Sequence, residues 1–232
     1  IKAKLDAGRS ILYQTARYVD IYKALEDIQR ERKLTAEERQ ELKKYSRLAD
    51  AFTPLAKGMN SEYANQNTYD AIQVHGGSGF IMEYKCQRLY RDARIFSIYE
   101  GTTQLQVVAA IRYISNGTYL GIIKEMLEKE VADELKPLKA RVVEMVNLYE
   151  QALEYVKEAQ DQEMHDFLAR RLYNMTCEII MSLLILEDAT RSAELFAKSA
   201  NVYVRMAQAN VFGEHAYITN FVKEDLPSFR AE

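Results

Sequence analysis

The spacing of apolar residues along the chain predicts helices almost throughout. Between residues 5 and 25, apolar positions recur at intervals of three, four or seven, which is the pattern of one face of an amphipathic helix. Thr35 and Glu38 have the spacing of a capping box and predict the start of a second helix. Thr53 followed by Pro54 is typical of an N-cap with proline in the first turn, so a third helix is predicted from residue 54 to the glycines at 76 and 77.

The pattern continues beyond these glycines. Further helices are predicted over about 85–93, 102–114, 120–131, 138–156, 164–189 and 193–212, with a glycine stop at Gly117. The longest apolar run, Ile179–Leu186, is too short for the roughly 18 to 20 residues of a membrane span and is interpreted as a buried bundle helix. The predicted fold class is all-α, with an up-and-down helical bundle over residues 1–116 and a second helical bundle over 117–232.

Composition supports this fold and excludes several functions. Three prolines and nine glycines in 232 residues are few, as expected of a helical chain. A net charge of -3 gives no reason to expect nucleic acid or an anionic membrane as a partner. Cys86 and Cys177 are expected to be small buried residues in a reducing compartment. The three histidines are too scattered for a metal site, so none is expected.

One segment, residues 73–104, carries three short motifs that point to chemistry. Their residues are Gln73-x-x-Gly76-Gly77-x-Gly79-Phe80, Arg91-Asp92-Ala93-Arg94-Ile95 and Tyr99-Glu100-Gly101-Thr102-x-Gln104. Alone, the glycine cluster would indicate a helix stop, and it lacks the G-x-G-x-x-G of a dinucleotide site. An isolated glutamate before a helix would indicate a charge that complements the helix dipole. Together and in this order, the motifs resemble those of the acyl-CoA dehydrogenase family.

The resemblance covers about residues 1–115, which are similar to the C-terminal helical domain of that family, truncated at its N-terminus. Residues 117–232 are interpreted as a helical extension of unknown role, and the chain as the C-terminal fragment of a longer protein, inactive by itself. The implied activity is FAD-dependent α,β-dehydrogenation of an acyl-CoA thioester, as in fatty acid β-oxidation. Some family members place the base on an earlier helix, before Ile1, and Glu100 favours the standard arrangement.

The resemblance also implies roles for single residues. Glu100 is the expected catalytic base, and enclosure between substrate and flavin is expected to raise its pKa toward working pH. Its backbone N–H is expected to hold the thioester carbonyl. The implied substrate contacts are Tyr99 and Gly101. The implied FAD contacts are Thr102, Thr103 and Gln104 for the flavin, and Gln73, Val74, His75, Gly76 and Gly77 for the adenosine diphosphate half.

Because that FAD belongs largely to a neighbouring subunit in the family, a homodimer or homotetramer is expected. An electron-transfer flavoprotein is the expected acceptor, in the bacterial cytoplasm or, in a eukaryote, the mitochondrial matrix. Two alternatives remain open, an acyl-CoA oxidase and a non-catalytic helical interaction module. Arg91, Asp92 and Arg94 are interpreted as ion pairs that brace the loop below Glu100.

Overall fold

A computed structural model describes residues 1–230 of the chain, and every regular element in that range is a helix. The described residues divide into two compact units, Ala3–Gln106 and the residues from Val107 onward. The predicted all-α class, with one helical bundle followed by another, is confirmed. The domain boundary at residue 116 stays a prediction, since α5 (Thr103–Ser115) begins in the first unit and ends in the second.

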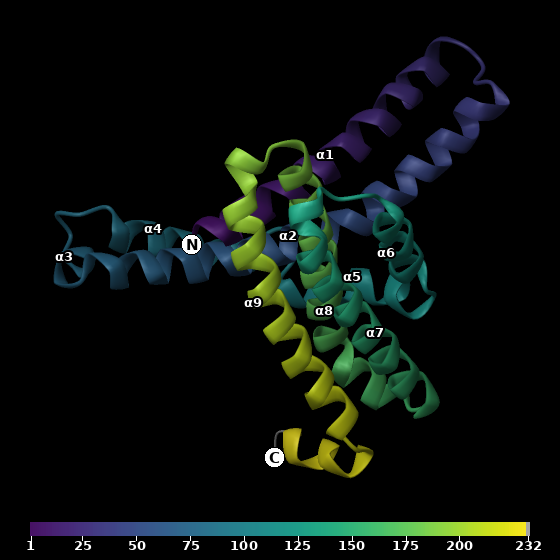
Figure 1. Ribbon diagram of the computed structural model, residues 1–232. Coiled ribbons are helices and arrows are strands. Elements are labelled where there is room, and N and C mark those ends of the chain that lie inside the picture. The colour runs from purple at the N-terminus through teal and green to yellow at the C-terminus, as the bar shows by residue number, and fades with distance from the viewer. Residues whose placement is uncertain (231–232) are drawn as a thin grey trace. The chain divides into compact units, whose positions relative to one another are not determined.

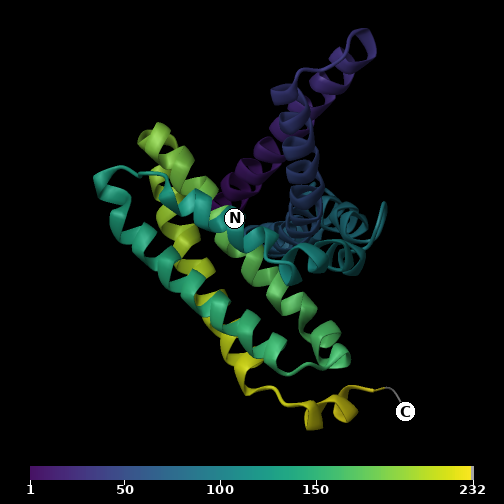
Figure 2. The same cartoon turned by 90° about the vertical axis from the view of Figure 1, so that its right-hand side faces the viewer.

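The first unit is built on two long antiparallel helices, α1 (Lys2–Glu31) and α2 (Ala36–His75), which lie side by side in both views (Figures 1 and 2). Tyr18 of α1 packs edge-on against Phe52 of α2, with ring centroids 5.1 Å apart. Nearer the other end of the pair, Asn60 Nδ2 donates to the Gly8 carbonyl at 3.1 Å. These contacts fix the register between the two helices.

Helix α2 begins where the sequence predicts but does not break at Pro54. The Thr35 hydroxyl accepts from the Glu38 N–H at 3.2 Å, and the Glu38 carboxylate accepts from the Thr35 N–H at 2.8 Å, which is the capping box. The predicted helix start at Thr53–Pro54 is wrong, because α2 runs through it. Pro54 has no N–H for the Asp50 carbonyl, yet it is buried. Tertiary packing therefore outweighs the lost hydrogen bond.

Short elements fold back along the second half of α2. They are α3 (Gly77–Phe80), α4 (Cys86–Ala93) and the 3₁₀ helix η1 (Arg94–Ser97). All three contact α2, and η1 leads through residues 98–102 into α5. The motif segment of the sequence is thus laid along one helix.

The second unit contains α6 (Thr118–Glu128), η2 (Asp133–Leu135), α7 (Lys136–Glu158), α8 (Gln162–Arg191), α9 (Ala193–Asn220) and η3 (Lys223–Phe229). Helices α7, α8 and α9 pack side by side (Figure 2). The apolar run of α8 is buried throughout, as predicted, with Cys177 beside it. Within residues 1–230, no helix has the length and hydropathy needed to cross a bilayer.

Candidate functional site

Glu100 lies on a strained loop, residues 98–102, between η1 and α5. Glu100 adopts a φ of +50° and Gly101 a φ of +93°. A residue with a side chain in the left-handed region costs on the order of 1–3 kcal/mol and persists only where its surroundings fix it. The backbone at Glu100 is therefore held in place by contacts from elsewhere in the unit.

Lys57, in the middle of α2, supplies those contacts on both sides of Glu100. Its Nζ donates to the Phe96 carbonyl at 2.8 Å and to the Gly101 carbonyl at 2.6 Å. Gln106 Nε2 donates to the same Gly101 oxygen at 3.3 Å. Hydrogen bonds from a charged donor are shorter and stronger than neutral ones. The ammonium of Lys57 is thus the firmer of the two anchors of the loop.

The functional groups of Glu100 face outward. Its side chain is exposed, and Tyr99 beside it is half exposed. Among residues 1–230, no group accepts a hydrogen bond from the backbone N–H of Glu100. Both the carboxylate and the N–H can therefore meet a ligand. The dry enclosure expected for a base is not provided by the described residues of this chain.

The three residues predicted to contact flavin at the start of α5 have different surroundings. The Thr102 hydroxyl accepts from the Leu105 N–H at 3.3 Å and caps the helix. Thr103 is buried, and its hydroxyl donates to Glu62 Oε1 at 2.6 Å. Gln104 is exposed. The structure therefore leaves the Gln104 side chain open to a ligand, and no group among residues 1–230 accepts a hydrogen bond from the Gln104 backbone N–H.

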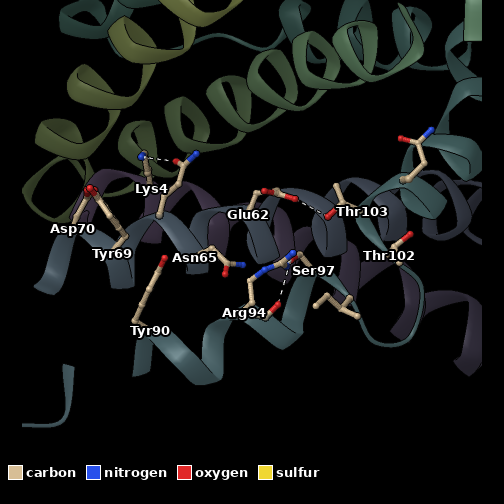
Figure 3. A pocket seen from close by; sticks show the side chains of 13 residues that line it. Lys4, Glu62, Asn65, Tyr69, Asp70, Tyr90, Arg94, Ser97, Thr102 and Thr103 are labelled. Carbon is tan, nitrogen blue, oxygen red and sulfur yellow. Dashed lines mark hydrogen bonds between the residues drawn. The ribbon is translucent and has the colours of Figure 1, made fainter. Parts of the chain in front are cut away.

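An open polar hollow of about 710 Å³ lies beside this loop (Figure 3). The three predicted flavin contacts, 102–104, line it, whereas Glu100 does not. Figure 3 shows the Thr103 hydroxyl directed at Glu62 and the Arg94 guanidinium directed at Ser97, to which it donates at 2.5 Å.

The expected ion pairs at residues 91–94 are not formed. Within residues 1–230, none of Arg91, Asp92 and Arg94 has an acidic or basic partner within salt-bridge distance. Arg94 instead donates to Ser97, three residues ahead, because the tight 3₁₀ turn brings these two side chains together. Arg91 and Asp92 are exposed on α4.

The glycine turn at the end of α2 leaves its backbone accessible. Gly76 has φ +59° and ψ −142°, a conformation nearly restricted to glycine. A Cβ built at Gly76 or Gly77 would meet no atom within 4 Å, so a ligand can approach this backbone closely. A Cβ at Gly79 would lie 2.7 Å from the Ile72 carbonyl oxygen, so this glycine lets α3 lie against α2. All five predicted contact residues of the turn, 73–77, are exposed.

The side chains around the turn are suited to a ligand or a partner. His75 Nδ1 donates to the Ala71 carbonyl at 2.8 Å, and the imidazole is exposed. Val74, Phe80 and Met82 are 77%, 77% and 85% exposed. Exposed apolar groups gathered in one place mark surfaces that bind something.

The turn and the Glu100 loop lie at different points of α2. Lys57 and Gly76 are nineteen positions apart in the sequence, which corresponds to about 28 Å at the rise of an α-helix. Sequence reasoning missed two residues of α2: Lys57, which holds the loop, and Glu62, which accepts from Thr103 at the start of α5. The sequence does single out Lys57, because it is the only charged residue between Asp50 and Glu62. Within residues 1–230, no cluster of three or more His, Cys, Asp or Glu side chains is arranged for a metal ion.

Two family models match nearly the whole chain. Residues 1–113 match the model described as "Acyl-CoA dehydrogenase, C-terminal domain", and residues 115–226 match "Acyl-CoA dehydrogenase C terminal". A stretch of 52 residues is 54% identical to the caffeyl-CoA reductase-Etf complex subunit CarC of Acetobacterium woodii. That stretch is 22% of this chain and 14% of the relative, so the chain matches only a small part of that protein.

Two solved structures share the fold over the described chain. The acyl-CoA dehydrogenase of Bacillus anthracis, complexed with FAD, is 21% identical with a TM-score of 0.64, over 98% of this chain and 42% of that one. Caenorhabditis elegans ACDH-11, in complex with C11-CoA, is 19% identical with a TM-score of 0.70, over 99% of this chain and 38% of that one. The chain thus spans about two fifths of the length of each.

Proposed function

Because the chain belongs to the acyl-CoA dehydrogenase family, we propose that it forms the C-terminal part of an enzyme that oxidises an acyl-CoA thioester between Cα and Cβ. Glu100 is the proposed base for the α-proton. The observation that carries this proposal is the held, left-handed backbone of Glu100, with its carboxylate exposed beside the start of α5. Strain of this kind is concentrated at functional sites.

The residues of the chain fit FAD. The backbone of Gly76 and Gly77 has open space around it, and at the start of α5 the Gln104 N–H has no acceptor among residues 1–230 and is of the kind that binds anionic or electron-rich groups. In the proposed enzyme, residues 73–77 hold the adenosine diphosphate half of FAD, and residues 102–104 hold the flavin. FAD, when bound, supplies the acceptor for the hydride that leaves Cβ.

The chain's own contribution to the reaction is at Cα. The Glu100 carboxylate accepts the proton, and the Glu100 N–H donates to the thioester oxygen as that oxygen gains negative charge. Tyr99 and Gly101, which precede and follow Glu100 in the chain, contact the substrate in the proposed enzyme. Substrate and flavin together would exclude water from this exposed carboxylate, which strengthens every electrostatic interaction there.

We also propose a homodimer or homotetramer in which each FAD is held by two copies. The separation of about 28 Å along α2 between the glycine turn and the Glu100 loop supports this, since it places the two sets of contacts apart within one chain. The exposed apolar side chains Val74, Phe80 and Met82 support it as well. This chain alone is then inactive.

The proposed electron acceptor is an electron-transfer flavoprotein, in the bacterial cytoplasm. It is supported by the relative from Acetobacterium woodii, whose name places it in an Etf complex. The same relative favours a second candidate, reduction of an α,β-unsaturated acyl-CoA. That reaction is the reverse of dehydrogenation, so a protonated Glu100 would deliver the proton to Cα by microscopic reversibility.

The test is anaerobic mixing of the flavin-loaded protein that carries this chain with a series of acyl-CoA thioesters, followed by flavin absorbance. Loss of oxidised flavin, with slow reoxidation after air is admitted, is the result expected of a dehydrogenase. Fast reoxidation of reduced flavin by an enoyl-CoA would favour the reductase, and rapid peroxide formation in air would identify an oxidase. Binding of acyl-CoA without any change in flavin would refute catalysis and leave an interaction module.

A further inference from the structure

We propose that Lys57 is a positioning residue for proton abstraction, which rests on the proposed role of Glu100 as the base. The Lys57 ammonium does not act on the Glu100 side chain directly; it donates to the backbone carbonyls of Phe96 and Gly101, at 2.8 and 2.6 Å. These two carbonyls bracket Glu100 in the chain. One ammonium therefore ties both ends of the loop to the same point of α2.

The Gly101 carbonyl depends on side chains for its hydrogen bonds. The first backbone bond into α5 runs from the Gln106 N–H to the Thr102 carbonyl at 3.1 Å, so the Gly101 carbonyl lies outside the helical ladder. It accepts from Lys57 and, at 3.3 Å, from the Gln106 side chain. Removing Lys57 would leave this end of the loop with only the longer, neutral bond.

The conformation that Lys57 holds is the unfavourable one. Glu100 has φ +50°, and a glutamate released from its neighbours returns to negative φ. Rotation of φ at this residue would swing both its N–H and its carboxylate. Because a displacement of about 1 Å at the reacting groups can cost 10²-fold in rate, a small relaxation is enough to matter.

A lysine suits this position for a specific reason. The ammonium offers three hydrogens without a fixed plane, so it can serve two carbonyls that approach from different directions. Lys57 is half-buried, whereas Lys43 on the same helix is exposed. Within residues 1–230 the Lys43 side chain makes no hydrogen bond or ion pair, so Lys43 is a matched control.

The test compares Lys57→Met, Lys57→Arg and Lys43→Met in the flavin-loaded protein that carries this chain. Lys57→Met is expected to slow flavin reduction by acyl-CoA about 10- to 100-fold, with unchanged FAD content and acyl-CoA dissociation constant. Lys57→Arg restores part of the rate, and Lys43→Met stays near wild type. The deuterium isotope effect from Cα-labelled substrate should rise in Lys57→Met, because abstraction becomes more rate-limiting. Lys57→Gln, which is polar but shorter, repeats the comparison if Lys57→Met does not keep FAD.

A double-mutant cycle separates this inference from the proposed function. In Glu100→Gln, which lacks the base, Lys57→Met should cause no further loss of reduction, since there is nothing left to position. An equal loss in both backgrounds would show a general structural role and overturn the inference. Lys57 variants that reduce flavin as fast as Lys43→Met would also overturn it, while leaving Glu100 in place. Near-normal reduction by Glu100→Gln would instead refute the proposed base.

Discussion

Three glycines of the turn after α2 should respond differently to alanine. Gly76 has a conformation nearly closed to other residues, at φ +59° and ψ −142°, but open space around it. Gly77 has neither constraint, since its φ is not positive and no atom lies within 4 Å of an added Cβ. Gly79 has an ordinary φ, but its added Cβ would lie 2.7 Å from the Ile72 carbonyl oxygen.

The magnitudes follow from these two constraints. Gly76→Ala should cost about 1–3 kcal/mol of backbone strain. Gly79→Ala should cost a similar 1–3 kcal/mol, because a contact with backbone cannot be relieved by rotating a side chain and α3 must move away from α2. Gly77→Ala should stabilise the turn by about 0.4–1 kcal/mol, since it restricts the unfolded chain without straining the folded one.

Hydrogen exchange of the backbone amides at 76–84, measured on the flavin-free protein, reads this local stability directly. At about 1.4 kcal/mol per factor of ten, Gly76→Ala and Gly79→Ala should speed exchange on the order of 5- to 150-fold, while Gly77→Ala slows it. Gly121→Ala, on α6 in the other unit, should leave exchange at 76–84 unchanged. Equal exchange in Gly79→Ala and Gly77→Ala would refute the close approach of α3 to α2.

Three further outcomes are expected. Hydrogen bonds from Arg32, and from the backbone at residue 35, lower the pKa of Glu38 from 4.5 to about 2. The stability that the ionised Glu38 carboxylate contributes to the fold is therefore present above pH 4.5 and is lost as the pH falls toward 2. Carboxyl NMR titration should show this value, and Arg32→Met should raise it. Burial raises the pKa of the Cys177 thiol, so a thiol reagent should modify the partly exposed Cys86 in the folded protein and Cys177 only after unfolding. Phe52→Ala, at a fully buried position, should lower the free energy of unfolding by about 3–5 kcal/mol in urea denaturation.

Local signals in the sequence were sufficient for most of the helices. The capping box at Thr35 and Glu38 forms as its spacing predicts, because both of its hydrogen bonds are made within four residues. The apolar run Ile179–Leu186 is buried in α8, because eight residues without a charged side chain are stabilised when they are removed from water. Such features depend on neighbours in the chain and can be predicted without the fold.

Features that depend on distant neighbours could not be predicted in the same way. Pro54 has the local signature of a helix start, but packing of the unit holds α2 continuous through it. The charges of Arg91 and Asp92 suggested ion pairs, but no opposite charge in the described chain lies against them. Whether a charge finds a partner is decided by the surfaces that the fold brings together.

The candidate site shows the same limit. The motif identified Glu100 and the glycine turn, but not that the loop of Glu100 is held at Lys57 of α2, nineteen residues or about 28 Å of helix before Gly76. The motif did not identify Lys57 either. The two acceptors of Lys57 are backbone carbonyls, which every residue has, so no residue type in the sequence indicates them. Only the path of η1 and the loop along α2 brings that ammonium to the Phe96 and Gly101 carbonyls.

The most direct test of the account is the rate of flavin reduction by acyl-CoA in Glu100→Gln, measured anaerobically in the flavin-loaded protein against wild type. Glutamine keeps the size and the backbone N–H but cannot take a proton. If Glu100 is the base, FAD and acyl-CoA bind normally to Glu100→Gln and flavin reduction is slowed by at least 10²- to 10⁴-fold. Reduction at close to the wild-type rate would show that another group removes the proton and would contradict the assignment of Glu100.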